Sequence, residues 1–79
     1  MINNDRRLYR VLEFPKHLQT TILALMKLGQ ATAEDVASVT GKARAVESAY
    51  LNQLVVMKIV SKSRSGRKMY FNVVLEALD

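Results

Sequence analysis

The sequence has no cysteine and a single histidine, His17. The absence of cysteine excludes disulfides, thiolate metal ligands and cysteine nucleophiles. One histidine without a cysteine does not make a zinc site, because such a site draws on about four ligands. We therefore expect no cofactor, no metal site and no metal effector.

Long apolar runs are also missing. The longest, Ile22 to Met26, has five residues, whereas a helix that crosses a bilayer needs about 20. The segment Met1 to Asp5 is too polar for a secretion signal. A chain of 79 residues is long enough for one compact domain. We expect a cytoplasmic protein with no membrane partner.

Catalytic constellations are equally scarce. No nucleophile–base pair, glycine-rich phosphate loop or carboxylate pair stands out in the sequence. Glu34 and Asp35 are adjacent, so on a helix their side chains point apart. We expect no catalytic residues and no enzymatic activity.

Positive charge is plentiful and unevenly distributed. The net charge is +5, yet residues 42–68 alone hold seven lysines and arginines against one acid, Glu47, a net of +6. A basic stretch of this kind favours a polyanionic partner, nucleic acid above all.

The first half of the chain predicts helices. Residues 2–14 fit a short helix or a strand, and either would end near Phe14 because Pro15 disfavours helical geometry in the residue before it. A helix is predicted over 15–28, with proline at its first position and Gly29 as its C-cap. Its apolar residues recur at spacings of three and four: Leu18, Ile22, Leu25, Met26 and Leu28.

Two more helices follow. Thr32 is a plausible N-cap with Asp35 in the position of a capping-box acid, which predicts a short helix that ends before Gly41. A longer helix is predicted over 43–57. Its expected apolar side consists of Val46, Tyr50, Leu51, Leu54 and Val55.

The pattern then becomes extended. Residues 59–64 and 67–74 are typical of strands, and Ser65-Gly66 between them is a hairpin turn signal. A two-residue turn at this place predicts cross-strand pairs of Arg64 with Arg67, Lys62 with Met69 and Val60 with Phe71. The hairpin would be apolar at its base and cationic at its tip.

This order of elements resembles the winged helix-turn-helix domains of the ArsR-like family and, less closely, of the MarR-like family. The resemblance covers residues 15–74. Its most specific part is the hairpin sequence Ser65 to Phe71, which matches the family's Gly-Arg-basic-apolar-Tyr-Tyr/Phe pattern. The other matching residues are Ala31 to Ala37, Thr40-Gly41, Tyr50-Leu51, Leu54 and Ile59-Val60.

The resemblance implies an α+β fold, mostly helical, with a three-helix core and a β-hairpin wing. Residues 15–74 would form the DNA-binding domain. Residues 1–14 would be an N-terminal segment available for dimerisation, and residues 75–79 a short C-terminal tail.

The resemblance also implies where DNA would bind. Helix 43–57 would enter the major groove, and the wing 59–74 would lie along phosphates or in the minor groove. Thr32 and Ala33, at a helix N-terminus, would face a phosphate. The family's base-facing positions fall on Arg44, Ala45, Ser48 and Ala49, and the remaining expected contacts are Lys42, Lys62, Arg64, Arg67 and Lys68.

Two residues depart from the family pattern. Glu47 stands where an apolar residue is usual, so either the helix is rotated slightly or Ala43 and Tyr50 repack the core. On the recognition surface, its carboxylate would repel phosphate or accept a hydrogen bond from cytosine. Lys58 replaces the glycine that commonly precedes the first wing strand.

We expect a nucleoid-associated regulator, most simply a repressor, that binds double-stranded DNA sequence-specifically. It would act as a homodimer joined by apolar terminal residues: Leu8, Val11, Leu12, Phe14, Leu75 and Leu78. Two alternatives stay open: a winged helix used for protein–protein contact in a transcription or replication assembly, and a nonspecific architectural or RNA-binding role.

Overall fold

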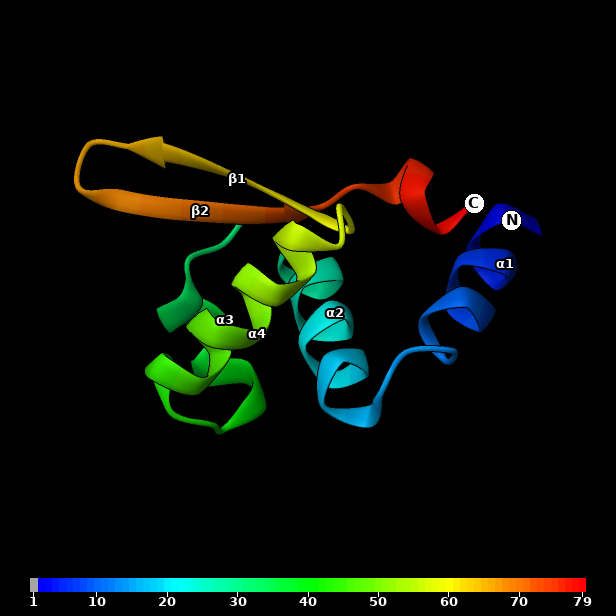
Figure 1. Ribbon diagram of the computed structural model, residues 1–79, viewed down its shortest axis with the longest axis horizontal. Helices are drawn as coiled ribbons and strands as arrows, with labels where there is room; N and C mark the ends of the chain where they lie inside the picture. The colour runs from blue at the N-terminus through cyan, green and yellow to red at the C-terminus, as the bar shows by residue number, and fades with distance from the viewer. Residues whose placement is uncertain (1) are drawn as a thin grey trace.

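The computed structural model describes residues 2–79 and consists of helices followed by one antiparallel hairpin (Figure 1). Helices α2, α3 and α4 pack on one another, and the hairpin extends from them as a long arm. The expected mostly helical α+β fold is confirmed. The elements are α1 (Ile2–Val11), α2 (Lys16–Leu28), α3 (Ala33–Thr40), α4 (Arg44–Val56), β1 (Val60–Ser65), β2 (Lys68–Val73) and the 3-10 helix η1 (Leu75–Leu78).

The three central helices form where the sequence predicts them, with shifts of one residue at some ends. Pro15 is the N-cap of α2 rather than its first residue, and Gly29 follows its last turn with a φ of 85°. Leu28, one of the apolar residues of the predicted helix 15–28, is exposed, and so is Val39 of α3. Each stands in the last turn of its helix, where fewer neighbouring elements are available to cover a side chain.

The connection from α3 to α4 is a tight turn. Gly41 is the C-cap of α3 in the left-handed conformation, with a φ of 79°, and its N–H donates to the carbonyl of Ala37 at 2.8 Å. A residue with a Cβ pays a steric cost in this conformation, so glycine is favoured here. Ala43 caps α4 without a side-chain hydrogen bond.

The predicted register of the hairpin is wrong, because the observed turn lies one residue later in the chain than the predicted one. The observed pairs are Ser65 with Lys68, Arg64 with Met69, Lys62 with Phe71 and Val60 with Val73, so the two loop residues are Gly66 and Arg67. A type II′ hairpin turn needs a positive φ at its first loop residue. Gly66 has a φ of 63°, whereas Ser65 would be strained there.

The base of the hairpin is attached to the helical body through the connection between α2 and α3. Ala31 and Phe71 exchange two backbone hydrogen bonds, of 3.0 and 2.7 Å. Phe71 is buried with Val60 and Val73, so the apolar base belongs to the same core as the helices. The largest apolar side chains of this core that are fully buried are Val11, Leu18, Ile22, Leu25, Val36, Leu51, Leu54 and Leu78.

The terminal segments lie together at the end of the molecule opposite the hairpin tip (Figure 1). The ambiguous N-terminal stretch is a helix, α1, which contacts η1 and α2. Val11 and Leu78 are fully buried, so they belong to the core and are not available to a partner subunit, contrary to the expectation. Within residues 2–79, no helix has the length and apolar character needed to cross a membrane.

Candidate nucleic-acid interface

A groove of about 410 Å³ lies between the start of α3, the exposed side of α4 and the hairpin. Because cross-strand partners point to the same face of a hairpin, Lys62 and Arg64 share the face of Phe71 and Met69, which line this groove. Two cations of the wing are thus directed toward the groove beside α4. The other cations of the groove are Arg44, Arg67 and Lys68.

Most residues predicted to bind DNA lie on this one groove. Eight of the eleven line it: Thr32, Ala33, Arg44, Ser48, Lys62, Arg64, Arg67 and Lys68. The other three, Lys42, Ala45 and Ala49, are exposed on the α3–α4 turn and on α4 but are not part of the groove lining. Elements that are far apart in the sequence thus present one cationic surface, on which Glu34 and Asp35 are the acids.

Glu47, the acid that the sequence analysis considered for the recognition surface, is in the core. Its side chain is 0% exposed, and its two carboxylate oxygens accept hydrogen bonds from Thr21 Oγ1 and Thr40 Oγ1, both at 2.7 Å. From the sequence we expected either a rotated helix or a core repacked by Ala43 and Tyr50, and both expectations are wrong. Glu47 occupies the core position where an apolar residue is usual, while Val46 is 37% exposed. All seven cations of residues 42–68 are exposed, so no acid of that stretch offsets them at the surface.

Asn52 belongs to the groove, and sequence reasoning missed it. Its Nδ2 donates to the carbonyl of Ser48 at 2.9 Å, and its Oδ1 accepts from Lys62 Nζ at 3.0 Å. The amide therefore links α4 to β1 across the groove. The spacing of four from Ser48 places both residues on one face of the helix, and this spacing was the signal that could have found Asn52.

Known structures of transcriptional regulators have a similar fold. One neighbour is the antimony-specific transcriptional repressor AntR, with a TM-score of 0.71 and 24% identity over 90% of this chain. Another is the homodimeric winged helix-turn-helix DNA-binding domain Mb0332 from Mycobacterium bovis, a possible ArsR-family transcriptional regulator, with a TM-score of 0.66 and 26% identity over 91% of this chain. The chain has the winged helix-turn-helix fold.

The resemblance predicted from the sequence is thereby confirmed: this winged helix-turn-helix domain has the fold of DNA-binding transcriptional regulators. It spans 63% of the length of AntR and 65% of the Mycobacterium bovis fragment. A protein of Archaeoglobus fulgidus without an assigned function is a member of the same family as this chain, with 48% identity over 59 residues, which are 75% of this chain and 80% of that protein. No family model matches the sequence.

At the start of α3, the winged helix-turn-helix domain carries a complete capping box. Asp35 N–H donates to Thr32 Oγ1, and Thr32 N–H donates to Asp35 Oδ2, both at 3.1 Å. The first N–H groups of a helix have no partner within it, and Ala33 and Glu34, which carry two of these groups, line the groove. The Asp35 carboxylate beside them already supplies part of the negative charge that a helix N-terminus favours.

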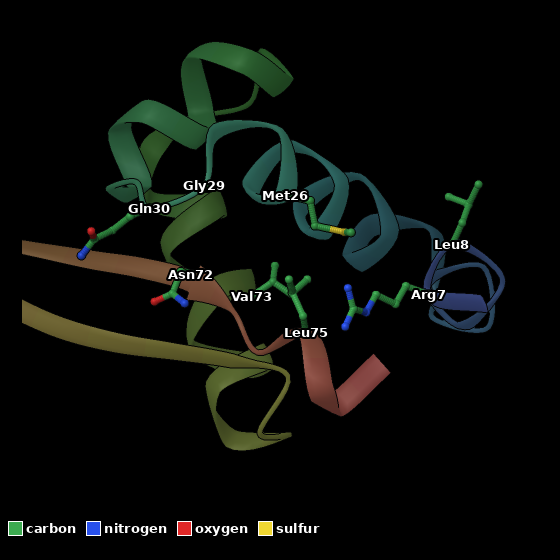
Figure 2. Close-up of a pocket in the computed structure, with 8 residues that line it drawn as sticks. All are labelled: Arg7, Leu8, Met26, Gly29, Gln30, Asn72, Val73 and Leu75. Carbon is green, nitrogen blue, oxygen red and sulfur yellow. The ribbon is translucent and has the colours of Figure 1, made fainter. Parts of the chain in front are cut away.

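A second hollow, of about 680 Å³, lies at the other end of the domain (Figure 2). Side chains from α1, α2, β2 and η1 surround it, and Leu8, Met26, Val73 and Leu75 make much of its lining apolar. Arg7 lies beside it and binds both carboxylate oxygens of Asp79, at 2.6 and 3.1 Å. These hydrogen bonds lower the pKa of Asp79 and raise the pKa of Arg7.

The part of the chain that the structure describes holds no group of three or more histidine, cysteine, aspartate or glutamate side chains arranged to hold a metal ion.

Proposed function

We propose that this winged helix-turn-helix domain binds double-stranded DNA sequence-specifically as a transcriptional regulator, most simply a repressor. Helix α4 would lie in the major groove, and the hairpin would follow phosphates or enter the minor groove. The observation that supports this most directly is the cationic groove between α4 and the hairpin. Phosphate contacts supply much of the affinity of such proteins, and side chains on a helix in the major groove supply base reading.

The surface of α4 suits close approach to bases. Ala45 and Ala49 are exposed and small, so the helix backbone can sit deep in the groove, and an alanine methyl can contact a thymine methyl. Arg44 is exposed in the first turn, where its guanidinium can offer a bidentate fork to guanine. Burial of Glu47 keeps its carboxylate off the recognition surface.

The experiment is a selection from random duplexes, followed by binding of the selected duplex over a range of salt concentrations. The affinity should fall steeply with salt, because bound phosphates release counterions. The double variant Arg64→Ala/Arg67→Ala should weaken binding to all duplexes and flatten the salt dependence. A variant with the same loss of charge away from the groove, Arg10→Ala/Lys27→Ala, is the control.

Each outcome separates the proposal from its alternatives. Binding without preference for any sequence would contradict base reading and favour an architectural role. No duplex binding at low salt would contradict the proposal as a whole and favour protein–protein contact. Equal losses in the two double variants would show that only net charge matters, not the groove.

We propose further that the domain forms a homodimer through α1 and η1. The Mycobacterium bovis relative is homodimeric, and α1 and the turn that follows it expose apolar side chains at the rim of the second hollow and beside it. Leu8, Tyr9 and Leu12 are 46%, 69% and 54% exposed, and Leu75 of η1 is 40% exposed. A second copy that covered them would bury apolar surface that a monomer leaves in water.

Light scattering during gel filtration at micromolar concentration tests the dimer. The wild type should elute with twice the monomer mass, and Leu8→Glu/Leu12→Glu should shift it to the monomer. Val56→Glu is the matched control, because Val56 is 80% exposed on α4 and lies outside this surface. A wild-type protein that is monomeric throughout would contradict the proposal.

A further inference from the structure

We infer that Glu47 is a positioning residue for sequence recognition: it fixes the rotation of α4 about its own axis and thereby selects the side chains that face DNA. The inference rests on the proposed function, because it concerns how the same surface reads bases. It adds a residue that does not touch DNA itself.

The contacts of Glu47 connect all three helices of the core. One carboxylate oxygen accepts from Thr21 of α2 and the other from Thr40 of α3, while Glu47 itself stands in the first turn of α4. Thr40 Oγ1 also accepts from the backbone N–H of Lys42 at 3.3 Å, so the turn into α4 belongs to the same network. Among the described side chains, no lysine or arginine forms an ion pair with Glu47.

Such a network can fix a helix rotation that apolar packing leaves loose. Burial of apolar surface has no preferred direction, whereas hydrogen bonds of 2.7 Å require defined angles. Val46 is the competing apolar residue, and a step of one residue turns a helix by about 100°. With Val46 inward, Arg44 and Ser48 would turn out of the positions from which they line the groove.

The hydroxyls of Thr21 and Thr40 can form other hydrogen bonds when Glu47 is replaced. Thr21 Oγ1 lies 3.3 Å from the carbonyl oxygen of His17, and Thr40 is only half-buried, so water can reach it. An apolar side chain of similar volume at this position avoids the cost of taking a carboxylate out of water. A leucine at position 47 should therefore preserve the fold and remove only the directional contacts, which separates positioning from stability.

The experiment compares wild type, Glu47→Leu and Glu47→Gln on the selected duplex and on a scrambled duplex at one salt concentration. The wild type should prefer the selected duplex by about a thousandfold or more. In Glu47→Leu this ratio should fall about tenfold, while affinity for the scrambled duplex changes by less than about twofold, because phosphate contacts remain. Glu47→Gln can still bond both threonines and should keep the ratio within about threefold.

Thermal unfolding of the same proteins completes the test. Glu47→Leu should melt within about 5 °C of the wild type or above it. Two results would overturn the inference and leave the proposed function intact. One is a folded Glu47→Leu protein with the wild-type ratio of affinities for the selected and scrambled duplexes. The other is a Glu47→Gln ratio as low as that of Glu47→Leu. A wild type with no preferred duplex would overturn both the proposed function and the inference.

If Glu47→Leu does not fold, Thr21→Val removes one hydrogen-bond donor to Glu47 instead. A ratio of affinities reduced at least threefold in Thr21→Val supports the inference, and an unchanged ratio overturns it.

Discussion

At the scale of single residues, the cations of the groove should differ in what they read. Arg44 lies in the first turn of α4, whereas Lys68 lies at the start of β2. We predict that Arg44→Ala lowers the preference for the selected duplex by about 1–3 kcal/mol, the worth of a bidentate contact to guanine. Lys68→Ala should weaken binding to all duplexes alike and reduce the slope of log affinity against log salt concentration by about one unit.

Fluorescence anisotropy with selected and scrambled duplexes at several salt concentrations measures the effects of both variants. Identical behaviour of the two variants would contradict the division of roles.

Lys58 is the second residue whose role can be tested singly. It occupies the left-handed conformation, with a φ of 66°, at the end of α4. Its N–H bonds the carbonyl of Val55, and the N–H of Ile59 bonds that of Leu54, both at 3.0 Å. This is the Schellman arrangement, in which glycine usually occupies the position of Lys58.

We predict that Lys58→Gly raises the free energy of unfolding by about 0.5–1 kcal/mol. The left-handed conformation costs a residue with a Cβ roughly 1–2 kcal/mol, and the greater flexibility of unfolded glycine offsets part of the gain. Lys58→Ala is the control, since it loses the ammonium group but keeps the Cβ. Urea denaturation of the three proteins gives the comparison, and a Lys58→Ala protein as stable as Lys58→Gly would refute the strain.

At the scale of elements, η1 is held to α1 by the ion pair of Arg7 with Asp79. Hydrogen bonds from Arg7 hold the pKa of Asp79 below its ordinary value of 3.8. A lowered carboxylate pKa means that the contact is fully present above pH 3.8 and is lost as the pH falls through the lower, folded-state pKa. The pair is partly exposed, with side chains 21% and 39% accessible, so it should govern the local attachment of η1 rather than global stability.

We predict a corresponding pH dependence at Arg7. In the wild type, the NMR signal of Arg7 Nε should shift with a midpoint below pH 3.8, as Asp79 takes up a proton. In Asp79→Asn that transition should be missing, while the signal of Arg10, which pairs with Glu13, serves as an internal reference. A transition at Arg7 that persists in Asp79→Asn would assign it to another carboxyl group.

At the scale of the whole molecule, the domain is elongated, with principal extents of 37 × 23 × 21 Å, and its two candidate surfaces lie at opposite ends (Figure 1). The hairpin and the groove occupy one end, and α1 with η1 occupies the other. Pairing through α1 and η1 would therefore leave both grooves free for two half-sites on DNA.

A homodimer predicts that stability depends on protein concentration. The midpoint of thermal unfolding should rise by a few degrees between 1 and 100 µM, because association favours the folded state by mass action. Leu8→Glu should flatten this dependence, and Val56→Glu should retain it. Differential scanning fluorimetry over the concentration series measures it, and a flat wild-type curve would speak against the dimer.

Much of the fold could be read from local signals. The capping box of Thr32 and Asp35 and the turn at Gly41 follow from backbone requirements that few residues satisfy, and the structure bears both out. The hairpin was also predicted, but its register was wrong, because Ser65-Gly66 and Gly66-Arg67 are both two-residue loops. Only the need for a positive φ at the first loop residue separates them.

By itself, the sequence determined the order of the three central helices and the hairpin, the turn at Gly41 and the concentration of cations in residues 42–68. Each of these depends on residues within a few positions of one another. Tertiary structure alone decided that Glu47 points inward, because its partner Thr21 lies 26 positions away, and that Asn52 reaches Lys62 across the groove. It also divided the terminal apolar residues into buried Val11 and exposed Leu8, since a helical pattern marks an apolar face but not which neighbours cover it.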